Sequence, residues 1–270
     1  MKIVFLGGGN MATALIGGMI KRGAAPVSIQ VIEKAAENRQ RLTQEFGIEC
    51  VAGADRTSMH SDVIVLAVKP QQMREAVAPL VGKLKSQLVV SIAAGLRLAD
   101  IRRWLGGYKR LVRAMPNTPA LIGAGVTGLY AASSVSKTER QAAESIMAAV
   151  GSTLWVDDEG MMDAVTAISG SGPAYVFYFL AAMQQAAVQL GFGVEQARKL
   201  SLDTFLGAAR LAEQSGEDVA VLRDRVTSKG GTTEAALVAM DANNVAAAIA
   251  HAVQAAQARG RELGEQLGRD

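Results

Sequence analysis

The first half of the chain alternates short runs rich in β-branched residues with stretches that have the pattern of helices. The β-branched runs lie at residues 3–6, 29–32, 63–68, 88–92, 111–114 and 153–156. Strands that alternate with helices favour a parallel, doubly wound sheet, because right-handed crossovers place helices on its two faces. We therefore expect an α/β domain up to about residue 157.

The second half has a different character, because β-branched runs disappear and long Ala-, Leu- and Met-rich stretches follow. Helices are predicted at residues 174–190, 194–213 and 243–263, and Pro173 is the last proline. We therefore divide the chain into domains 1–157 and 158–270, the second one all-helical. Helices with such broad apolar faces need burial on more than one side, which predicts an interface between copies of the chain.

Composition excludes several classes of function. The net charge is only +3 and basic residues form no runs with aromatics, so we expect no nucleic acid partner. The one cysteine and two histidines form no cluster at metal-ligand spacing, so we predict no metal. A single cysteine is typical of a reducing compartment, so we predict a cytoplasmic location. The longest apolar run, residues 172–183, is shorter than the ~18 residues of a membrane helix, so we predict no membrane span.

A glycine-rich turn follows the first predicted strand. Its pattern, Gly7-x-Gly9-x-x-Ala12, matches the dinucleotide fingerprint, in which the glycines allow the turn and the approach of a pyrophosphate. The pattern predicts a Rossmann-type cofactor domain. A tight turn without a ligand is the alternative.

The end of the second strand bears on which dinucleotide binds. Glu33 stands about 20 residues after the turn, where an acid usually accepts a ribose hydroxyl of NAD. Lys34 and Arg39 could instead pair with the 2′-phosphate of NADP. The residues therefore leave NADP and NAD open.

Three further loops follow predicted strands at the carboxyl edge of the sheet, where ligands bind in such folds. Ala67-Val68-Lys69-Pro70 offers one cation, and Ala93-Ala94-Gly95 leaves room for a flat ring. Asn117 stands between Pro116 and Pro119, which restrict the backbone. Asn117 either contacts the nicotinamide or caps a rigid turn of its own.

A second candidate anion site lies late in the chain, at Ser228-Lys229-Gly230-Gly231-Thr232-Thr233, directly before a predicted helix. Free N–H groups and the dipole at a helix start favour an anion there. The segment Ser169-Gly170-Ser171-Gly172-Pro173 opens another helix. Together with residues 228–233 this segment could enclose a small polar ligand. The alternative is a helical kink whose small residues pack where two helices cross.

In these stretches the chain resembles the bacterial pyrroline-5-carboxylate reductases. The resemblance covers nearly the whole chain, and its most specific part is residues 226–237. It implies transfer of hydride from NADPH, or from NADH, to the ring C=N of 1-pyrroline-5-carboxylate to give L-proline, the last step of proline biosynthesis. It also implies a helical dimerisation domain and a homodimer, with a larger ring such as a decamer left open.

The resemblance also assigns residues. The substrate carboxylate is expected at Ser228, Gly230, Gly231, Thr232 and Thr233, and Thr233 is expected to form a hydrogen bond at the ring nitrogen. The cofactor is expected at Gly7, Gly8, Gly9, Asn10, Met11, Ala67, Val68, Lys69, Pro70, Ala93, Ala94 and Gly95, with Lys34 at the 2′-phosphate and Asn117 beside the nicotinamide. Lys229 departs from the proline of many relatives but leaves the donors intact.

Two rival functions remain. A 3-hydroxyacid dehydrogenase shares this architecture, but it needs a base, often a lysine at the position that Val176 holds here. The second rival is a non-catalytic protein that senses a dinucleotide. Such a protein does not need a second anion site, so residues 228–233 argue against it.

Overall fold

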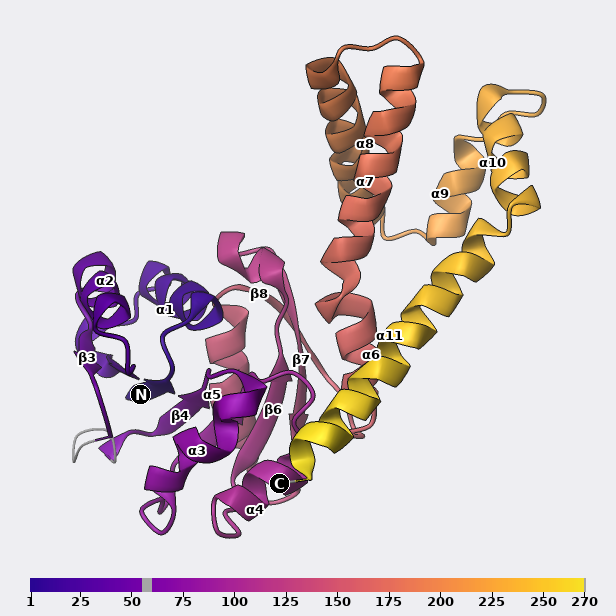
Figure 1. The fold of residues 1–270 in the computed structure, drawn as a ribbon. Coiled ribbons are helices and arrows are strands. Elements are labelled where there is room, and N and C mark those ends of the chain that lie inside the picture. The colour runs from indigo at the N-terminus through magenta and orange to yellow at the C-terminus, as the bar shows by residue number, and fades with distance from the viewer. Residues whose placement is uncertain (55–59, 270) are drawn as a thin grey trace. The chain divides into compact units, whose positions relative to one another are not determined.

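The computed structural model describes residues 1–54 and 60–269 of the chain. Contacts between residues divide it into two compact units (Figure 1). The first, which we call the α/β unit, comprises Met1–Ser171 and Ala256–Asp270. The second, the helical unit, comprises Gly172–Ala255. The last turns of the chain therefore belong to the α/β unit.

One sheet forms the centre of the α/β unit, with strand order β3-β2-β1-β4-β5-β6-β7-β8. The strands are β1 (Ile3–Leu6), β2 (Ile29–Ile32), β3 (Glu49–Val51), β4 (Val63–Leu66), β5 (Leu88–Ser91), β6 (Leu111–Met115), β7 (Gly125–Ala131) and β8 (Gly151–Trp155). All neighbouring pairs are parallel except β6 and β7. The doubly wound sheet expected from the alternating pattern is confirmed, and it is parallel except at β6 and β7.

Helices cover both faces of this sheet. They are α1 (Asn10–Lys21), α2 (Ala36–Phe46), α3 (Met73–Val77), α4 (Leu98–Trp104), α5 (Lys137–Ala148) and α6 (Met161–Val165), with a π-helix η6 (Thr166–Gly170) and 3₁₀ turns η1 (Pro26–Ser28), η3 (Pro70–Gln72), η4 (Ala78–Leu80) and η5 (Thr118–Ile122). Ile3 and Phe5 pack with α1, α2 and α5, whereas Val4 and Leu6 pack with α3 and α4. Alternate residues of one strand thus serve opposite cores, which explains the continuous apolar runs in the sequence.

Two strands were not predicted. β3 is a short edge strand that is partly exposed, and β7 carries glycines that interrupt its apolar pattern. Gly128 in β7 is needed for packing, because a Cβ there would lie 2.5 Å from a methyl group of Val165 in α6. The antiparallel β6–β7 pair is the one departure from the predicted parallel sheet.

The helical unit contains α7 (Gly172–Gln189), α8 (Val194–Ser215), α9 (Val219–Arg225), α10 (Thr232–Ala242) and the beginning of α11 (Val245–Gly268). α7 and α8 pack against each other as a hairpin. Among these described helices α7, α9 and α10 bury no residue, and α8 buries only Ala197 and Ser201. Large apolar side chains such as Phe177, at 65% exposure, remain on the surface. A single copy therefore gives this unit almost no core of its own.

The helical stretch Met161–Gln189 is longer than the apolar run predicted from the sequence. Within the described residues it is the one helix that is long and apolar enough to cross a membrane, by length and composition only. α10 and α11 pass the same test only if the two are counted together, with a bend of 52° between them. Only 6% of its most apolar window is buried, so most of this apolar surface is uncovered in a single copy.

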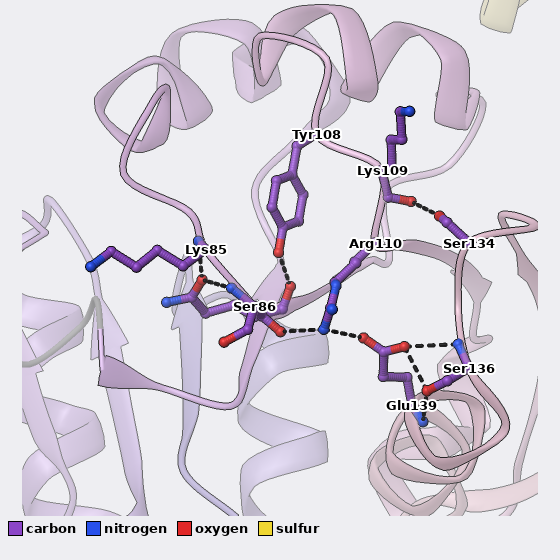
Figure 2. Close-up of polar contacts among 9 residues, drawn as sticks. Lys85, Ser86, Tyr108, Lys109, Arg110, Ser134, Ser136 and Glu139 are labelled. Atoms are coloured by element: carbon purple, nitrogen blue, oxygen red, sulfur yellow. Dashed lines mark hydrogen bonds and ion pairs between the residues drawn. The ribbon is translucent and has the colours of Figure 1, made fainter.

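Polar contacts hold the edge of the sheet where β5 and β6 begin (Figure 2). Arg110 donates to the carbonyl oxygen of Ser86 at 3.2 Å and to the Glu139 carboxylate at 3.1 Å. Ser136 and Glu139 form a capping box at the start of α5. Burial tends to raise the pKa of Glu139, but hydrogen bonds from Ser136 and the charge of Arg110 outweigh it and lower the pKa below 4.5. Burial raises the pKa of Tyr108, whose hydroxyl donates to the Gln87 carbonyl at 2.5 Å.

We expect Ser136→Ala to lower the free energy of unfolding by about 1 kcal/mol, because it removes the cap of α5. Since the pKa of Glu139 is lowered in the folded state, its contribution is present above pH 4.5 and is lost as pH falls through the lowered pKa. The difference between wild type and Ser136→Ala should therefore shrink below that pH in urea titrations. Ser145→Ala, an exposed change later in α5, is the control, and an equal loss in both variants would contradict the cap.

Candidate active site

A cavity of about 580 Å³ opens at the carboxyl ends of β1, β2 and β4. It is lined by Gly7, Gly8, Gly9, Lys34, Ala67, Val68 and Lys69 among the predicted residues, and by Leu6, Ile32, Glu33, Asn38, Ala52, Gly53, Ala54, Gln72, Glu75, Ala76, Ala78, Pro79 and Leu80 in addition. The structure thus brings the first glycine turn and the Ala67–Lys69 loop to one cavity. The segment from Gln72 to Leu80 was missed, because nothing in its sequence marks it except its position after β4.

The three glycines of the turn have different roles. Gly7 has φ +103°, and a Cβ there would lie 2.7 Å from the carbonyl oxygen of Ala67. A Cβ at Gly8 would lie 2.6 Å from Leu42. Gly9 is the N-cap of α1 without a side-chain cap, and a Cβ there would have no atom within 4 Å. Gly7 is therefore required by its backbone contact and its positive φ, whereas a larger residue at Gly8 would have to displace the Leu42 side chain. Gly9 leaves open space in front of the helix start, where Asn10 and Met11 begin α1.

Glu33 reaches back over this turn. Its carboxylate accepts from the N–H of Gly8 and from the N–H of Ala35, both at 2.9 Å. One oxygen thus sits at an N–H of the glycine turn, beside the cavity. A bound ribose that uses Glu33 must replace or share these contacts.

The two basic residues after β2 are placed differently. Arg39 donates to the carbonyl oxygens of Glu33 and Lys34 at 2.8 and 2.7 Å, so it holds the end of the strand. Lys34 lines the cavity and pairs with Glu75 at 2.6 Å, with both side chains largely exposed. A hydrogen bond from Lys34 and its charge lower the pKa of Glu75. Of these two, Lys34 is the cation available to a phosphate in the cavity.

The remaining predicted cofactor residues do not line this cavity. Pro70 begins η3 next to it. Ala93 is buried, and its N–H contacts the Ser91 hydroxyl at 3.3 Å. At Gly95, φ is +82° and the backbone meets α11, where a Cβ at Gly264 would lie 2.6 Å from the Gly95 carbonyl oxygen. The Ala93-Ala94-Gly95 loop is thus braced by the last turns of the chain, a contact that sequence reasoning did not anticipate.

Asn117 is 8% exposed and both ends of its side-chain amide are used inside the α/β unit. Its Oδ1 accepts from the N–H of Val126 at 2.9 Å, and its Nδ2 donates to the carbonyl oxygen of Ser169 at 3.1 Å. Asn117 therefore ties its loop to β7 and to the end of η6. It does not cap its own turn through either of these bonds.

The second predicted anion site forms the turn between α9 and α10 in the helical unit. Gly231 is the N-cap of α10 without a side-chain cap, and Thr232 and Thr233 are its first residues. The N–H of Gly230 donates to the Glu234 carboxylate at 2.6 Å, and the N–H of Gly231 donates to the Ser228 carbonyl at 3.0 Å. The first N–H groups of α10, at Thr232 and Thr233, are therefore the ones best placed for an anion. Glu234 already shows that the turn accepts a carboxylate.

Residues 1–54 and 60–269, which the structure describes, contain no group of three or more His, Cys, Asp or Glu side chains that could hold a metal ion.

We expect Gly9→Val to abolish dinucleotide binding while the protein stays folded. Its Cβ would stand in the open space at the start of α1, with no protein atom within 4 Å, where we expect a pyrophosphate to approach. Gly7→Ala is the contrasting variant, because its Cβ would meet the Ala67 backbone and should lower the melting temperature. Nucleotide affinity by fluorescence and thermal melts separate the two effects, and unchanged affinity in Gly9→Val would refute the assigned turn.

Comparison with known proteins matches both halves of the chain. The family pattern described as pyrroline-5-carboxylate reductase dimerisation matches residues 159–263, and the one described as NADP oxidoreductase, coenzyme F420-dependent, matches residues 2–95. The pyrroline-5-carboxylate reductase of Pseudomonas aeruginosa is 46% identical over 99% of this chain and 98% of its own. That of Haemophilus influenzae is 39% identical over 97% of each chain.

Solved structures agree. A pyrroline-5-carboxylate reductase from Coxiella burnetii has a TM-score of 0.91 and 40% identity, covering 97% of this chain and 98% of its own. The Plasmodium falciparum pyrroline carboxylate reductase with NADP bound has a TM-score of 0.86 and 28% identity, with 98% of each chain covered. A 3-hydroxyisobutyrate dehydrogenase from Mycobacterium tuberculosis, 13% identical with a TM-score of 0.51 over 86% of this chain and 71% of its own, shares the fold alone. This chain belongs to the pyrroline-5-carboxylate reductase family.

Proposed function

We propose that this protein is an NAD(P)H-dependent oxidoreductase that reduces the C=N bond of 1-pyrroline-5-carboxylate to L-proline, the final step of proline biosynthesis. The observation that carries the proposal is the pair of anion-binding helix starts, at Gly7–Gly9 and at residues 228–233, in one chain of this family. The first suits a pyrophosphate and the second a small carboxylate. A cytoplasmic location fits a biosynthetic enzyme of this kind.

The reduction of a protonated imine requires few catalytic side chains. A protonated cyclic imine already carries the positive charge that makes its carbon electrophilic, and the reduced nicotinamide supplies the hydride when bound. The protein has to orient the imine, hold its carboxylate and exclude water. This account explains why the candidate loop contains threonines, a serine and glycines but no histidine or cysteine.

In this proposal the carboxylate binds the N–H groups of Thr232 and Thr233, with the Ser228 hydroxyl and the Gly230-Gly231 turn around it. A substrate carboxylate there competes with Glu234 for the N–H of Gly230. The Thr233 hydroxyl is assigned to the hydrogen bond at the ring nitrogen, which makes it the candidate catalytic residue.

The direct test follows NADPH or NADH absorbance with purified protein and DL-1-pyrroline-5-carboxylate, in parallel with a 3-hydroxyacid and the oxidised cofactors. Oxidation of the cofactor that depends on the imine supports the reductase. Activity with the hydroxyacid alone would favour the dehydrogenase, and silence in both would favour a sensor.

We expect Thr233→Ala to lower kcat for the imine about 10- to 100-fold, because a hydrogen bond to a charged group contributes about 1.5–3 kcal/mol. Thr233→Ser keeps the hydroxyl and should retain most of the activity, and neither change should alter the Kd for NADPH. Equal losses in the two variants would argue that the methyl group, and not the hydroxyl, is what matters.

For the cofactor we propose NADPH as the preferred donor, with Lys34 at the 2′-phosphate. We expect Lys34→Ala to raise KM for NADPH about fivefold, a modest effect because the side chain is exposed. Glu75→Gln removes the carboxylate that competes for Lys34 and should lower the same KM. Both variants should leave KM for NADH unchanged, and a parallel change for the two cofactors would reject Lys34 as the phosphate contact.

The chain forms a homo-oligomer, as the dimerisation family of its helical region indicates. We propose a homodimer as the basic assembly, with a larger ring such as a decamer built from dimers. The exposed apolar side chains of α7, α8 and α10 support it, because their burial against a second copy supplies the core that one helical unit lacks.

A further inference from the structure

The helix that leads from the α/β unit into the helical unit contains a break created by its sequence. Pro173 has no N–H, so the carbonyl oxygen of Ser169, four residues earlier, loses the donor that an α-helix would provide. Directly before it the chain forms the π-helix η6, in which the N–H of Ser171 donates to Thr166 at 2.8 Å. The break therefore needs support from outside the helix.

Asn117 supplies that support. Its Nδ2 donates to the Ser169 carbonyl at 3.1 Å, which replaces the donor that Pro173 lacks. Its Oδ1 accepts from the N–H of Val126 in β7 at 2.9 Å, so the side chain is held at both ends. A buried amide held in this way has its position fixed by the sheet.

Arg113, Met115 and Asn117 lie on one face of the extended chain formed by β6 and the two residues after it, because alternate residues of such a chain point the same way. Each of the three contacts the segment from α6 to η6. Arg113, 2% exposed, pairs with Asp163 at 3.5 Å and with Glu159 at 3.4 Å. Met115 packs on η6, because a Cβ at Gly170 would lie 2.7 Å from its terminal methyl group. The contact of Asn117 lies next to the division between the units, which falls after Ser171. The sheet thus holds this helix up to the point where the helical unit begins.

We propose that Asn117 is a positioning residue for hydride transfer, which acts by holding the helical break at Ser169–Pro173 rather than by touching the cofactor. The helical unit that begins after the break carries the proposed substrate turn. A shift of the break would therefore impair turnover of the imine while the cavity at β1, β2 and β4 still binds the dinucleotide. This inference rests on the reductase function proposed above.

The test is a double-mutant cycle between Asn117→Asp and Pro173→Ala. Asn117→Asp keeps the shape and the acceptor for Val126, and as an ionised carboxylate it has no donor for Ser169. We expect it to lower kcat for the imine about tenfold, because a partly buried carbonyl loses its hydrogen-bond donor and the break loses its support, with the Kd for NADPH within about twofold of wild type. In the Pro173→Ala background residue 173 has an N–H that can reach the Ser169 carbonyl, so the same Asn117→Asp change should cost less than about threefold.

Asn243→Asp is the matched control, because it removes another bond from a side-chain amide to a helix carbonyl, that of Asn243 to Ala239 at 2.8 Å on an exposed surface. It should leave kcat and the Kd for NADPH at their wild-type values. The melting temperature of each variant is measured by circular dichroism. Asn117→Asp should lower it, and the double variant with Pro173→Ala should recover part of that decrease.

Three results would overturn the proposal. An equal loss of kcat in both backgrounds would show that the Ser169 carbonyl is not the partner that matters. A loss of NADPH affinity as large as the loss of kcat would make Asn117 a cofactor contact. A lower melting temperature in Asn117→Asp that Pro173→Ala does not recover in part would show that the bond to Ser169 is not what holds the break. Absence of turnover in the wild type would instead reject the reductase function itself.

Discussion

The close approach of Gly7 to the backbone of Ala67 is the contact on which the nucleotide site depends. This contact joins the loop after β1 to the loop after β4. Only glycine fits at residue 7, because a Cβ would meet the Ala67 backbone and because φ is +103°. Because β1 and β4 are parallel neighbours, both loops leave the same edge of the sheet. The cavity with Lys34 and Lys69 at its wall follows from that geometry.

The helical unit obeys a different constraint. Its helices leave Phe177, Tyr178 and Val238 exposed in one copy, with almost nothing buried between them. Surface of this kind is stable in water only when it is covered, and the dimerisation family that matches residues 159–263 accounts for the covering. Folding of this unit and assembly of the protein are therefore coupled in this account, whereas the α/β unit has two cores of its own.

Much of the fold could be predicted from the sequence, because the spacing of apolar residues and the positions of glycines indicate the local backbone conformation. Gly7, Gly9 and the apolar runs at β1, β4 and β5 led directly to the sheet and its cavity. β7 was missed because Gly125 and Gly128 interrupt its apolar run. These glycines allow close packing against Ala120 and Val165, and such contacts leave no signal in the local sequence pattern. The contact of Gly264 with Gly95 and the role of the Asn117 amide are tertiary facts that no local pattern encodes. The predicted roles of Thr233 and its neighbours come from family resemblance and stay predictions.

Two helix starts bind the two ligands in this mechanism, the one at Gly9 holding the cofactor and the one at Gly231 holding the substrate carboxylate. The decisive experiment is a crystal structure of the protein with NADPH and L-proline. We expect the pyrophosphate at the N–H groups that begin α1, and the proline carboxylate within hydrogen-bond distance of the N–H groups of Thr232 and Thr233. A proline carboxylate bound away from residues 228–233, or a pyrophosphate away from the glycine turn, would contradict it.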